Sequence, residues 1–452
     1  MYTDAITTFF DTHPVSRETV YDRLRGTIFG GALGDAIGLY TEFLSKELAR
    51  EAYPEGKFQL VDPVTEFEAD THRLKFVQTG WTDDTDHALL IILSYLHNNG
   101  CLDHLDFAQR LQFWVEQGLR CLDRLPLGIG RTVSQVVCDK SFLVDPAATA
   151  YAKWDKAKRN AAANGSLMRT YPLGVMCFDK TLEETFQIAN EFSLVTHADP
   201  RCVVSCCLVT ALIRGILREE VITEGDTDKV IEESLTWTES WLSEHNSLVN
   251  DTNRYPPIDR DEFRKHAFAR SLEDLQLDDA MKMGYVYKTL GASILLLRQG
   301  MRLLASSNPQ SLFEDLITDL IMEGGDADTN AAVAGSLLGA LIGYNKLPAK
   351  WKDGMMHAGW LLEKCDALAS VTRIDPLSEP YNGKDDLDTS LEGGKPRLTL
   401  PELHQREREF SQRWLIASSE ALEKREREEK EKLERTRKER PGSRLRRFLF
   451  RK

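Results

Sequence analysis

The chain has 452 residues, a formal net charge of −14, 42% hydrophobic residues and 28% charged residues. This length accommodates one large core or two domains, and the composition is that of an ordinary globular protein. The acidic balance argues against a body that binds nucleic acid.

No stretch reaches the roughly 20 uninterrupted apolar residues needed to span a bilayer, so we expect no transmembrane segment. The first residues lack the basic lead and apolar run of a secretory signal. The eight cysteines include no CxxC pair. This usage favours reduced, buried thiols in an intracellular protein, cytoplasmic or nuclear, over a disulfide framework or a zinc site.

The body of the chain, from about residue 20 to residue 370, shows helical spacing of apolar residues, as in segments 107–114 and 292–298. Alternation typical of strands is scarce, and 59–64 is one of few candidates. A polar stretch at about 219–270 is expected to hold one exposed helix and loops. We therefore predict an all-α fold.

Three glycines, Gly30, Gly34 and Gly38, are spaced one helical turn apart. Such a stripe allows another backbone to approach closely. A nucleotide-binding glycine loop is the rival interpretation, but the spacing is not GxGxxG and no strand precedes it. Packing alone would explain the stripe, while the acids Asp35 and Glu42 in the same segment favour a functional role.

The segment 80–86, GWTDDTD, precedes an apolar run. Thr82 is typical of a helix N-cap, and capping accounts for one acid in the first turn. Three acids, Asp83, Asp84 and Asp86, repel one another unless a cation neutralises them. Hard divalent cations such as Mg²⁺, Mn²⁺ or Ca²⁺ prefer oxygen ligands of this kind.

The segment 164–166, Asn-Gly-Ser, suits a turn whose backbone N–H groups face a phosphate, although a plain loop explains it nearly as well. His197 follows about thirty residues later. A lone histidine of this kind is more often structural than a ligand.

The segment 324–330, GGDADTN, again opens a predicted helix. An EF-hand is excluded because Ala331 and Leu337 stand where that loop needs glycine and an acid. The following helix carries a second glycine stripe at 335, 339 and 343. Pairing of the two stripes would bring Asp35 and Glu42 towards Asp326 and Asp328; alternatively, each stripe meets some other helix.

The chain changes character after Thr372. Residues 373–400, with prolines and paired glycines, are predicted to be a linker. Residues 401–452 are predicted to be a charged helical tail without sustained heptads. The tail ends in a basic patch within 441–452. We expect it to be a solvated extension, with contact to anionic lipid or nucleic acid as the alternatives.

The ordered motifs GDAIGLYTE, GWTDDTD, NGSLMR, THADP, GYVYKTL and GGDADTNAA closely resemble those of the ADP-ribosylglycohydrolase family, in particular a fungal-type subgroup. The resemblance implies an orthogonal multi-helix bundle over residues 20–372 and a site with two ions, Mg²⁺ or Mn²⁺. Its metal-ligand motifs match Thr82, Asp83, Asp84, Asp326, Asp328 and Thr329.

The same resemblance assigns catalytic roles to Glu42, Asp84 and Asp326. Residues that line the ADP-ribose cleft in the family match Asn164, Gly165, Ser166, Met168, His197, Gly284 and Tyr285. The sequence departs from the family in two places. Gly128 stands where many members carry an aspartate in a DIGxT motif, and residues 160–163 replace a lead rich in glycine and serine.

The function implied is hydrolysis of the glycosidic bond between ADP-ribose and a protein side chain or small acceptor, through an oxocarbenium-like transition state. The metals would orient the ribose hydroxyls and activate water, and Glu42 would position or deprotonate that water. Two alternatives stay open. One is a metal-dependent nucleotide or phosphoester hydrolase, and the other is a non-catalytic relative that binds ADP-ribose.

Overall fold

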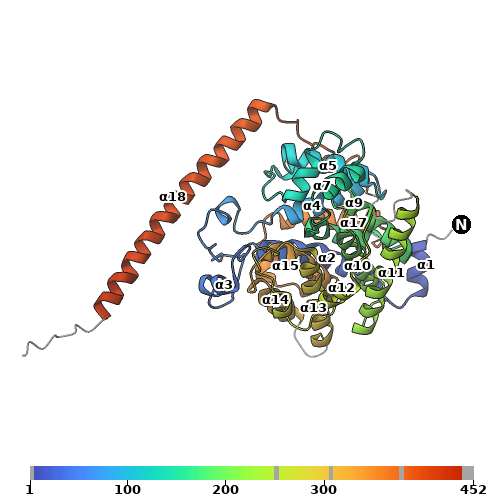
Figure 1. Ribbon diagram of the computed structural model, residues 1–452, viewed down its shortest axis with the longest axis horizontal. Coiled ribbons are helices and arrows are strands. Elements are labelled where there is room, and N and C mark those ends of the chain that lie inside the picture. Colours follow the sequence, from blue (N-terminus) through green and yellow to red (C-terminus); the bar gives the residue numbers. More distant parts are fainter. Residues whose placement is uncertain (1–4, 249–253, 305–308, 376–380, 440–452) are drawn as a thin grey trace, which may run out of the picture. The chain divides into compact units, whose positions relative to one another are not determined.

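The computed structural model describes residues 5–248, 254–304, 309–375 and 381–439. Within these ranges the regular structure is helical, with two isolated β-bridges and no extended strand (Figure 1). This confirms the predicted all-α class. The α-helices are α1 (Ala5–Thr12), α2 (Arg17–Gly38), α3 (Lys46–Ala52), α4 (Asp83–His97), α5 (His104–Gln117), α6 (Arg131–Val137), α7 (Pro146–Lys156), α8 (Leu167–Met176), α9 (Leu182–Leu194), α10 (Pro200–Leu217), α11 (Glu224–Leu248), α12 (Arg260–Ala267), α13 (Val286–Leu303), α14 (Pro309–Ile321), α15 (Ala327–Ile342), α16 (Ala349–Lys352), α17 (Ala358–Val371) and α18 (Leu400–Glu439).

The chain divides into two compact units. Unit 1 comprises residues 1–66 and 77–397, and unit 2 comprises residues 67–76 and 398–452. Unit 2 is built on α18, where the Trp414 indole N–H donates to the backbone oxygen of Thr71 at 3.0 Å. Arg425 of the same helix pairs with Glu68. The basic patch within 441–452 lies outside the described residues.

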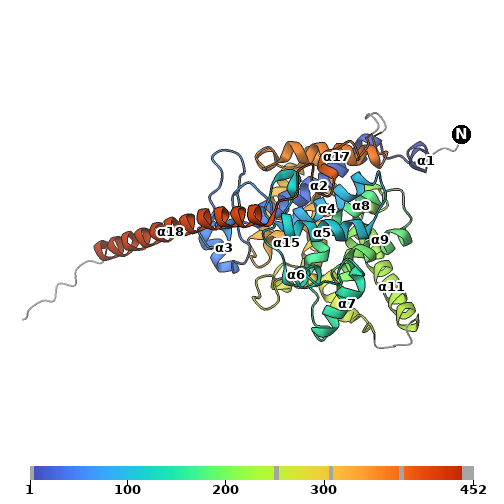
Figure 2. The ribbon, with the colours of Figure 1, turned by 90° about the horizontal axis from the view of Figure 1, so that it is seen from above.

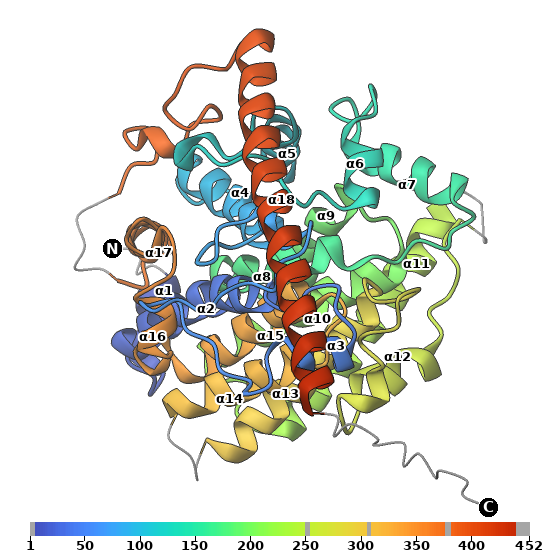
Figure 3. The ribbon, with the colours of Figure 1, turned by 90° about the vertical axis from the view of Figure 1, so that its left-hand side faces the viewer.

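Unit 1 is organised around α2 and α15, which lie side by side (Figures 1 and 3). The backbones touch because glycine or alanine faces glycine at successive turns. A Cβ atom added at Gly30 would collide with the carbonyl oxygen of Gly335, and one added at Gly34 with that of Ala331. The predicted pairing of the two glycine stripes is therefore confirmed.

Other helices enclose this pair. α13 and α14 pack on α15, while α10 packs on α8 and α9 (Figure 3). α10 is the one helix in the described ranges that is long and apolar enough to cross a membrane, and 94% of it is buried inside the protein. That burial is typical of a core helix.

Three segments differ from the sequence-based expectations. The strand candidate at 59–64 is a loop. The polar stretch at 219–270 holds two helices, α11 and α12, because apolar residues such as Ile231 and Phe263 recur on one face and are buried.

The third segment is 381–397, which composition predicts as a linker but which lies within unit 1. Its polar groups satisfy buried cations of the helical body. Asp386 accepts a hydrogen bond from Lys364 Nζ at 2.6 Å, and the Thr389 backbone oxygen accepts one from Arg110 at 2.8 Å. The compact unit thus extends to Arg397 rather than ending near Thr372.

The contact between α2 and α15 predicts how the protein responds to one added methyl group. Gly34→Ala should lower the free energy of unfolding by about 1–3 kcal/mol or more, because backbone atoms of Ala331 must move. Gly359→Ala is the control, since nothing lies within 4 Å of its added Cβ. Urea denaturation of both variants should show a loss for the first alone; equal midpoints would contradict the tight pairing.

Candidate functional site

The loop after α2 is joined to the loop before α15 by two backbone hydrogen bonds. Phe43 N donates to Gly325 O at 2.6 Å, and Gly325 N donates to Leu44 O at 2.9 Å. Gly325 has a φ of +71°, and a Cβ there would collide with the Leu277 backbone oxygen, so only glycine suits this position. The two loops therefore hold Glu42 beside Asp326.

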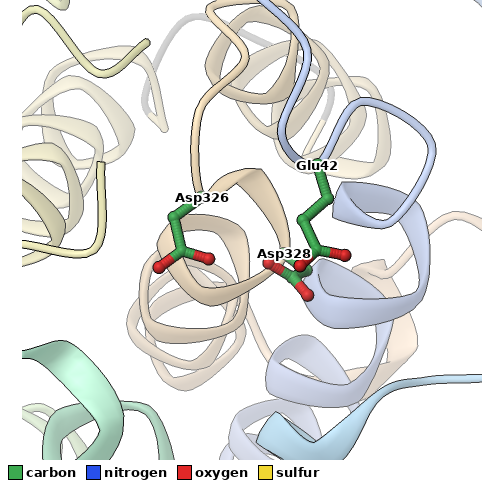
Figure 4. A group of neighbouring side chains, drawn as sticks. All are labelled: Glu42, Asp326 and Asp328. Carbon is green, nitrogen blue, oxygen red and sulfur yellow. The ribbon is translucent and has the colours of Figure 1, made fainter. Parts of the chain in front are cut away.

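Three carboxylates meet at this junction: Glu42 from the turn that follows α2, and Asp326 and Asp328 from the start of α15 (Figure 4). One oxygen of each lies within 4.8 Å of one oxygen of each of the others. Asp328 and Glu42 are buried. These are the separations expected when acids share one cation, since each oxygen ligand sits roughly 2–2.6 Å from the ion.

The N-terminus of α4 brings two more acids, Asp83 and Asp84, towards the three carboxylates. Thr82 caps α4, and its hydroxyl oxygen lies 3.2 Å from an oxygen of Asp84 and 3.3 Å from one of Asp328. Asp35 fixes this end of α4 by accepting hydrogen bonds from Thr82 N at 2.8 Å and Thr85 N at 2.9 Å. The structure thus brings together the acid clusters of segments 80–86 and 324–330.

Asp83, Asp84 and Asp328 are buried close to other carboxylates, and Asp326 is half-buried beside them. Burial and mutual repulsion raise the pKa of Asp83, Asp84 and Asp328 well above the usual range, and the pKa of Asp326 rises for the same reasons. Burial raises the pKa of Asp35 to about 6. In the described chain, no lysine or arginine forms an ion pair with Asp83, Asp84, Asp326 or Asp328.

The donor set fits a hard divalent cation. The Oδ1 atom of Asp84 is buried and has no hydrogen-bond partner in the described structure. The Thr329 hydroxyl lies near the same carboxylate and favours its charged form, which lowers the pKa of Asp84 against the effect of burial. Clustered carboxylates with nearby hydroxyls are the ligands preferred by Mg²⁺, Mn²⁺ or Ca²⁺. Thr82, Asp84, Asp326, Asp328 and Thr329 of the predicted ligands therefore lie close together. Asp83 is near enough to Glu42 for the repulsion between the two carboxylates to raise its pKa.

Asp86, the third acid of the GWTDDTD segment, is used differently. Its carboxylate accepts hydrogen bonds from the indole N–H groups of Trp81 at 2.8 Å and Trp114 at 3.1 Å. It also accepts one from Arg124 Nε at 2.9 Å. Asp86 is thus a structural acid that ties α4 to α5 and to the chain that follows.

Asn164 links the Asn-Gly-Ser segment to the acids. Its side-chain amide donates to Asp326 Oδ2 at 2.8 Å, and its backbone N–H donates to Gly284 O at 3.1 Å. Its amide also donates to Thr289 Oγ1, which in turn donates to Asn330. Thr289 and Asn330 were not predicted as site residues, although they lie inside the motifs GYVYKTL and GGDADTNAA.

The remaining predicted cleft residues divide into two groups. Gly165 lies against the ring of His197, whose Nδ1 is 2.7 Å from Thr196 Oγ1. The buried Nε2 of His197 has no hydrogen-bond partner among the residues that the structure describes. Burial lowers the pKa of His197 to about 3, so its ring is neutral. Ser166 and Met168 are buried, and the Ser166 hydroxyl accepts from Ser193 Oγ at 3.1 Å. Ser166 and Met168 therefore stabilise the Asn-Gly-Ser segment from the interior of the protein.

Tyr285 is held by charged neighbours at the start of α13. Its hydroxyl donates to Glu262 Oε1 at 2.9 Å, and the guanidinium of Arg201 lies over its ring at 5.6 Å. Arg201 is itself paired with Asp199 at 2.8 Å. The ring is therefore fixed in place rather than free to rotate.

Gly128 lies directly against Asp83. Its φ is +95°, and an added Cβ would collide with Asp83 Oδ1. An aspartate here would add both a clash and a like charge. The backbone at position 128 thus has a conformation that suits glycine better than the aspartate of the DIGxT motif.

The chain is similar to known proteins over most of its length. The ADP-ribosylglycohydrolase family model matches residues 16–376. The chain is 27% identical over 341 residues to an ADP-ribosylarginine hydrolase, Tri1, of Serratia proteamaculans, covering 74% of this chain and 76% of that protein. It is 22% identical to the ADP-ribosyl-[dinitrogen reductase] glycohydrolase of Rhodospirillum rubrum, with 79% and 99% covered.

Two further matches extend the set. The ADP-ribosylhydrolase ARH3 of Xenopus tropicalis is 25% identical, with 73% of this chain and 90% of that protein covered. A solved structure described as an ADP-ribosylglycohydrolase-related protein complex has a TM-score of 0.47 and 21% identity, and covers 78% of this chain and 99% of its own.

The two kinds of acid in segment 80–86 predict opposite effects on stability. Asp86→Ala should lower the free energy of unfolding by about 3 kcal/mol or more, because it leaves Arg124 and two indole N–H groups without their acceptor. Asp84→Asn should leave stability in a chelator unchanged or raise it, because it removes like-charge repulsion. Thermal unfolding in EDTA checks both; similar losses would contradict the distinction.

Proposed function

This chain belongs to the ADP-ribosylglycohydrolase family, and we propose that it hydrolyses, with a divalent metal, the glycosidic bond that joins ADP-ribose to a protein side chain or small acceptor. The observation that carries the proposal is the convergence of Glu42, Asp326 and Asp328 with the α4 acids in one buried space. Burying several carboxylates close together costs free energy, and a bound divalent cation would offset that cost. The same cation would be placed to contact the substrate.

One or two ions, either Mg²⁺ or Mn²⁺, would be held by Thr82, Asp83, Asp84, Asp326, Asp328 and Thr329. When bound, such ions would orient the ribose hydroxyls and make water a better nucleophile. Hydrogen bonds that hold the proposed ligands in place support this assignment. Asp35 fixes the start of α4, and Asn164 fixes Asp326.

Glu42 is the residue that we assign to the attacking water. It lies beside the proposed metal ligands but follows α2, so its carboxylate enters the site from the opposite loop (Figure 4). As a general base or a hydrogen-bond acceptor, it would orient that water towards the anomeric carbon. Asp84 and Asp326 contribute to catalysis by shaping the same charged space.

The other side of the site is suited to the ADP-ribosyl group. The neutral ring of His197 adjoins Gly165, and its buried Nε2 has no hydrogen-bond partner within the described part of the chain. Gly284 lies next to Asp326, where a side chain would occupy the space that the substrate needs. Tyr285 presents a fixed aromatic ring for stacking. These groups would position ADP-ribose so that its scissile bond faces Glu42.

The acceptor is left to experiment, with arginine, serine and small molecules as the candidates. Purified protein is incubated with ADP-ribosylated arginine and serine peptides, with and without Mg²⁺, and the products are followed by mass. We expect free ADP-ribose and unmodified peptide only when metal is present. Release of inorganic phosphate instead would identify a phosphoester hydrolase, and binding without turnover would identify a non-catalytic relative.

The eight cysteines are free thiols, and five of them are buried. This supports our proposal that the protein works in a reducing, intracellular compartment.

Asp326→Asn tests the metal site. The substitution keeps the size and the hydrogen-bonding shape but removes one charge, so Mg²⁺ affinity should fall at least tenfold and turnover should fall with it. The helical CD spectrum should stay the same. Calorimetric titration measures the affinity; unchanged Mg²⁺ binding would remove Asp326 from the ligand set.

Glu42→Gln tests the water-positioning role. ADP-ribose should bind about as well as before, while kcat falls at least tenfold. Loss of a general base typically lowers the rate by roughly 10²–10⁴-fold. Glu47→Gln, at an exposed position of α3, is the control and should be silent. If the Glu42 variant turns over at the normal rate, this carboxylate has a structural role only.

A further inference from the structure

Arg169 is a fully buried guanidinium at the start of α8 that the proposed function does not use. No carboxylate of the described chain pairs with it. Its Nη2 atom donates to the backbone oxygen of Phe192 at 3.2 Å and to Thr196 Oγ1 at 2.8 Å. Phe192 lies on α9, which packs beside α8, and Thr196 follows that helix (Figure 2). Burial lowers the pKa of Arg169 only to about 10, so it brings a charged donor to Thr196.

Thr196 connects this guanidinium to His197. Its Oγ1 atom lies 2.7 Å from His197 Nδ1 as well as 2.8 Å from Arg169 Nη2. Within the residues that the structure describes, this oxygen has no third hydrogen-bond partner. All three side chains are buried. Arg169, Thr196 and His197 thus form one buried chain of hydrogen bonds.

The direction of each hydrogen bond follows from the chemistry of the three groups. A guanidinium can only donate, so Thr196 Oγ1 accepts from Arg169. The hydroxyl proton of Thr196 then has His197 Nδ1 as its acceptor. A proton on Nδ1 would instead leave the hydroxyl proton buried without an acceptor, which costs free energy. His197 Nδ1 is therefore unprotonated.

The other ring nitrogen of His197 carries the proton. Burial lowers the pKa of His197 to about 3, so the ring is neutral and has one N–H group, at Nε2. A Cβ added at Gly165 would lie 3.4 Å from Nε2, so glycine keeps side-chain atoms away from this edge of the ring. Gly165 follows Asn164, whose amide donates to Asp326. The Nε2–H group therefore adjoins the segment that borders the acid cluster.

We propose that Arg169 and Thr196 are positioning residues that fix His197 as an Nε2–H donor to an oxygen of bound ADP-ribose. The identity of the ligand rests on the proposed function, whereas the tautomer rests on side chains of this chain alone. Without the two residues, the neutral ring would carry its proton on either nitrogen. A ring protonated at Nδ1 presents a lone pair at Nε2, and that lone pair repels an oxygen acceptor.

The tautomer is measured in the ligand-free full chain with isotope-labelled histidines, by long-range proton–nitrogen NMR correlation at neutral pH. The His197→Gln variant identifies the signals of His197. We expect an unprotonated Nδ1 and a protonated Nε2. Thr196→Val should give both tautomers, whereas Thr196→Ser keeps the hydroxyl and should keep the Nε2–H form. Thr210→Val is the matched control, because it removes another buried hydroxyl, one without a hydrogen-bond partner in the described structure.

Calorimetric titration with ADP-ribose and Mg²⁺ tests the donor role. Thr196→Val should weaken ADP-ribose binding by about fivefold, as expected for one hydrogen bond, while Thr196→Ser and Thr210→Val should change it less than twofold. Circular dichroism checks that each variant is folded. If Thr196→Val does not fold, the tautomer of the unmodified chain still decides the proposal.

A proton on Nδ1 of the unmodified chain, or a charged ring, would overturn the proposal. So would a Thr196→Val variant that keeps both the Nε2–H tautomer and the affinity for ADP-ribose. An altered tautomer with unchanged affinity would overturn the donor role. If the unmodified chain does not bind ADP-ribose at all, the proposed function fails instead, because the tautomer is read without any ligand.

Discussion

The backbones of α2 and α15 are in direct contact, and the rest of the site depends on this contact. It is possible only where glycine or alanine occupies successive turns of both helices, as at Gly30, Gly34 and Gly335. A close pair leaves no freedom in how the two helices are offset. The loop that follows α2 therefore meets the loop that precedes α15, and their backbones bond through Gly325. Glu42 and Asp326 come together as a result.

The acids gathered there are divided into two classes by their hydrogen-bond partners. Asp86 and Asp35 have their oxygens occupied by N–H and O–H donors, so they stabilise α4 and its neighbours. Asp83, Asp84 and Asp328 are buried among other carboxylates, which raises their pKa. Burying like charges close together costs free energy, and in the described structure no ion pair with a lysine or arginine offsets that cost. In our proposal a divalent cation offsets that cost and explains why the cluster is kept.

Much of this arrangement was accessible from the sequence, because spacing within a helix determines which residues share a face. The glycine stripes predicted the helix pair, and the pair predicted that the acids of 324–330 approach Glu42. The role of Asp86 was not accessible, since its donors Trp114 and Arg124 come from later segments and leave no local pattern.

Two other features were also hidden from pattern analysis. Segment 381–397 has the composition of a linker, yet its polar groups accept hydrogen bonds from Lys364 and Arg110. Such long-range pairings leave no periodic pattern in the sequence. Ser166 lies in the predicted cleft motif, but its hydroxyl points towards Ser193. The direction of a side chain in a short turn depends on packing, which the motif does not encode.

The central claim is that the buried carboxylates form a metal site, and anomalous diffraction from crystals grown with Mn²⁺ tests it most directly. The account predicts one or two manganese peaks, each roughly 2.0–2.6 Å from oxygens of Asp84, Asp326 and Asp328. Asp86 should lie outside the coordination sphere, because its oxygens are already bonded to Trp81, Trp114 and Arg124. Crystals of active protein with no manganese between α4 and α15 would contradict the claim.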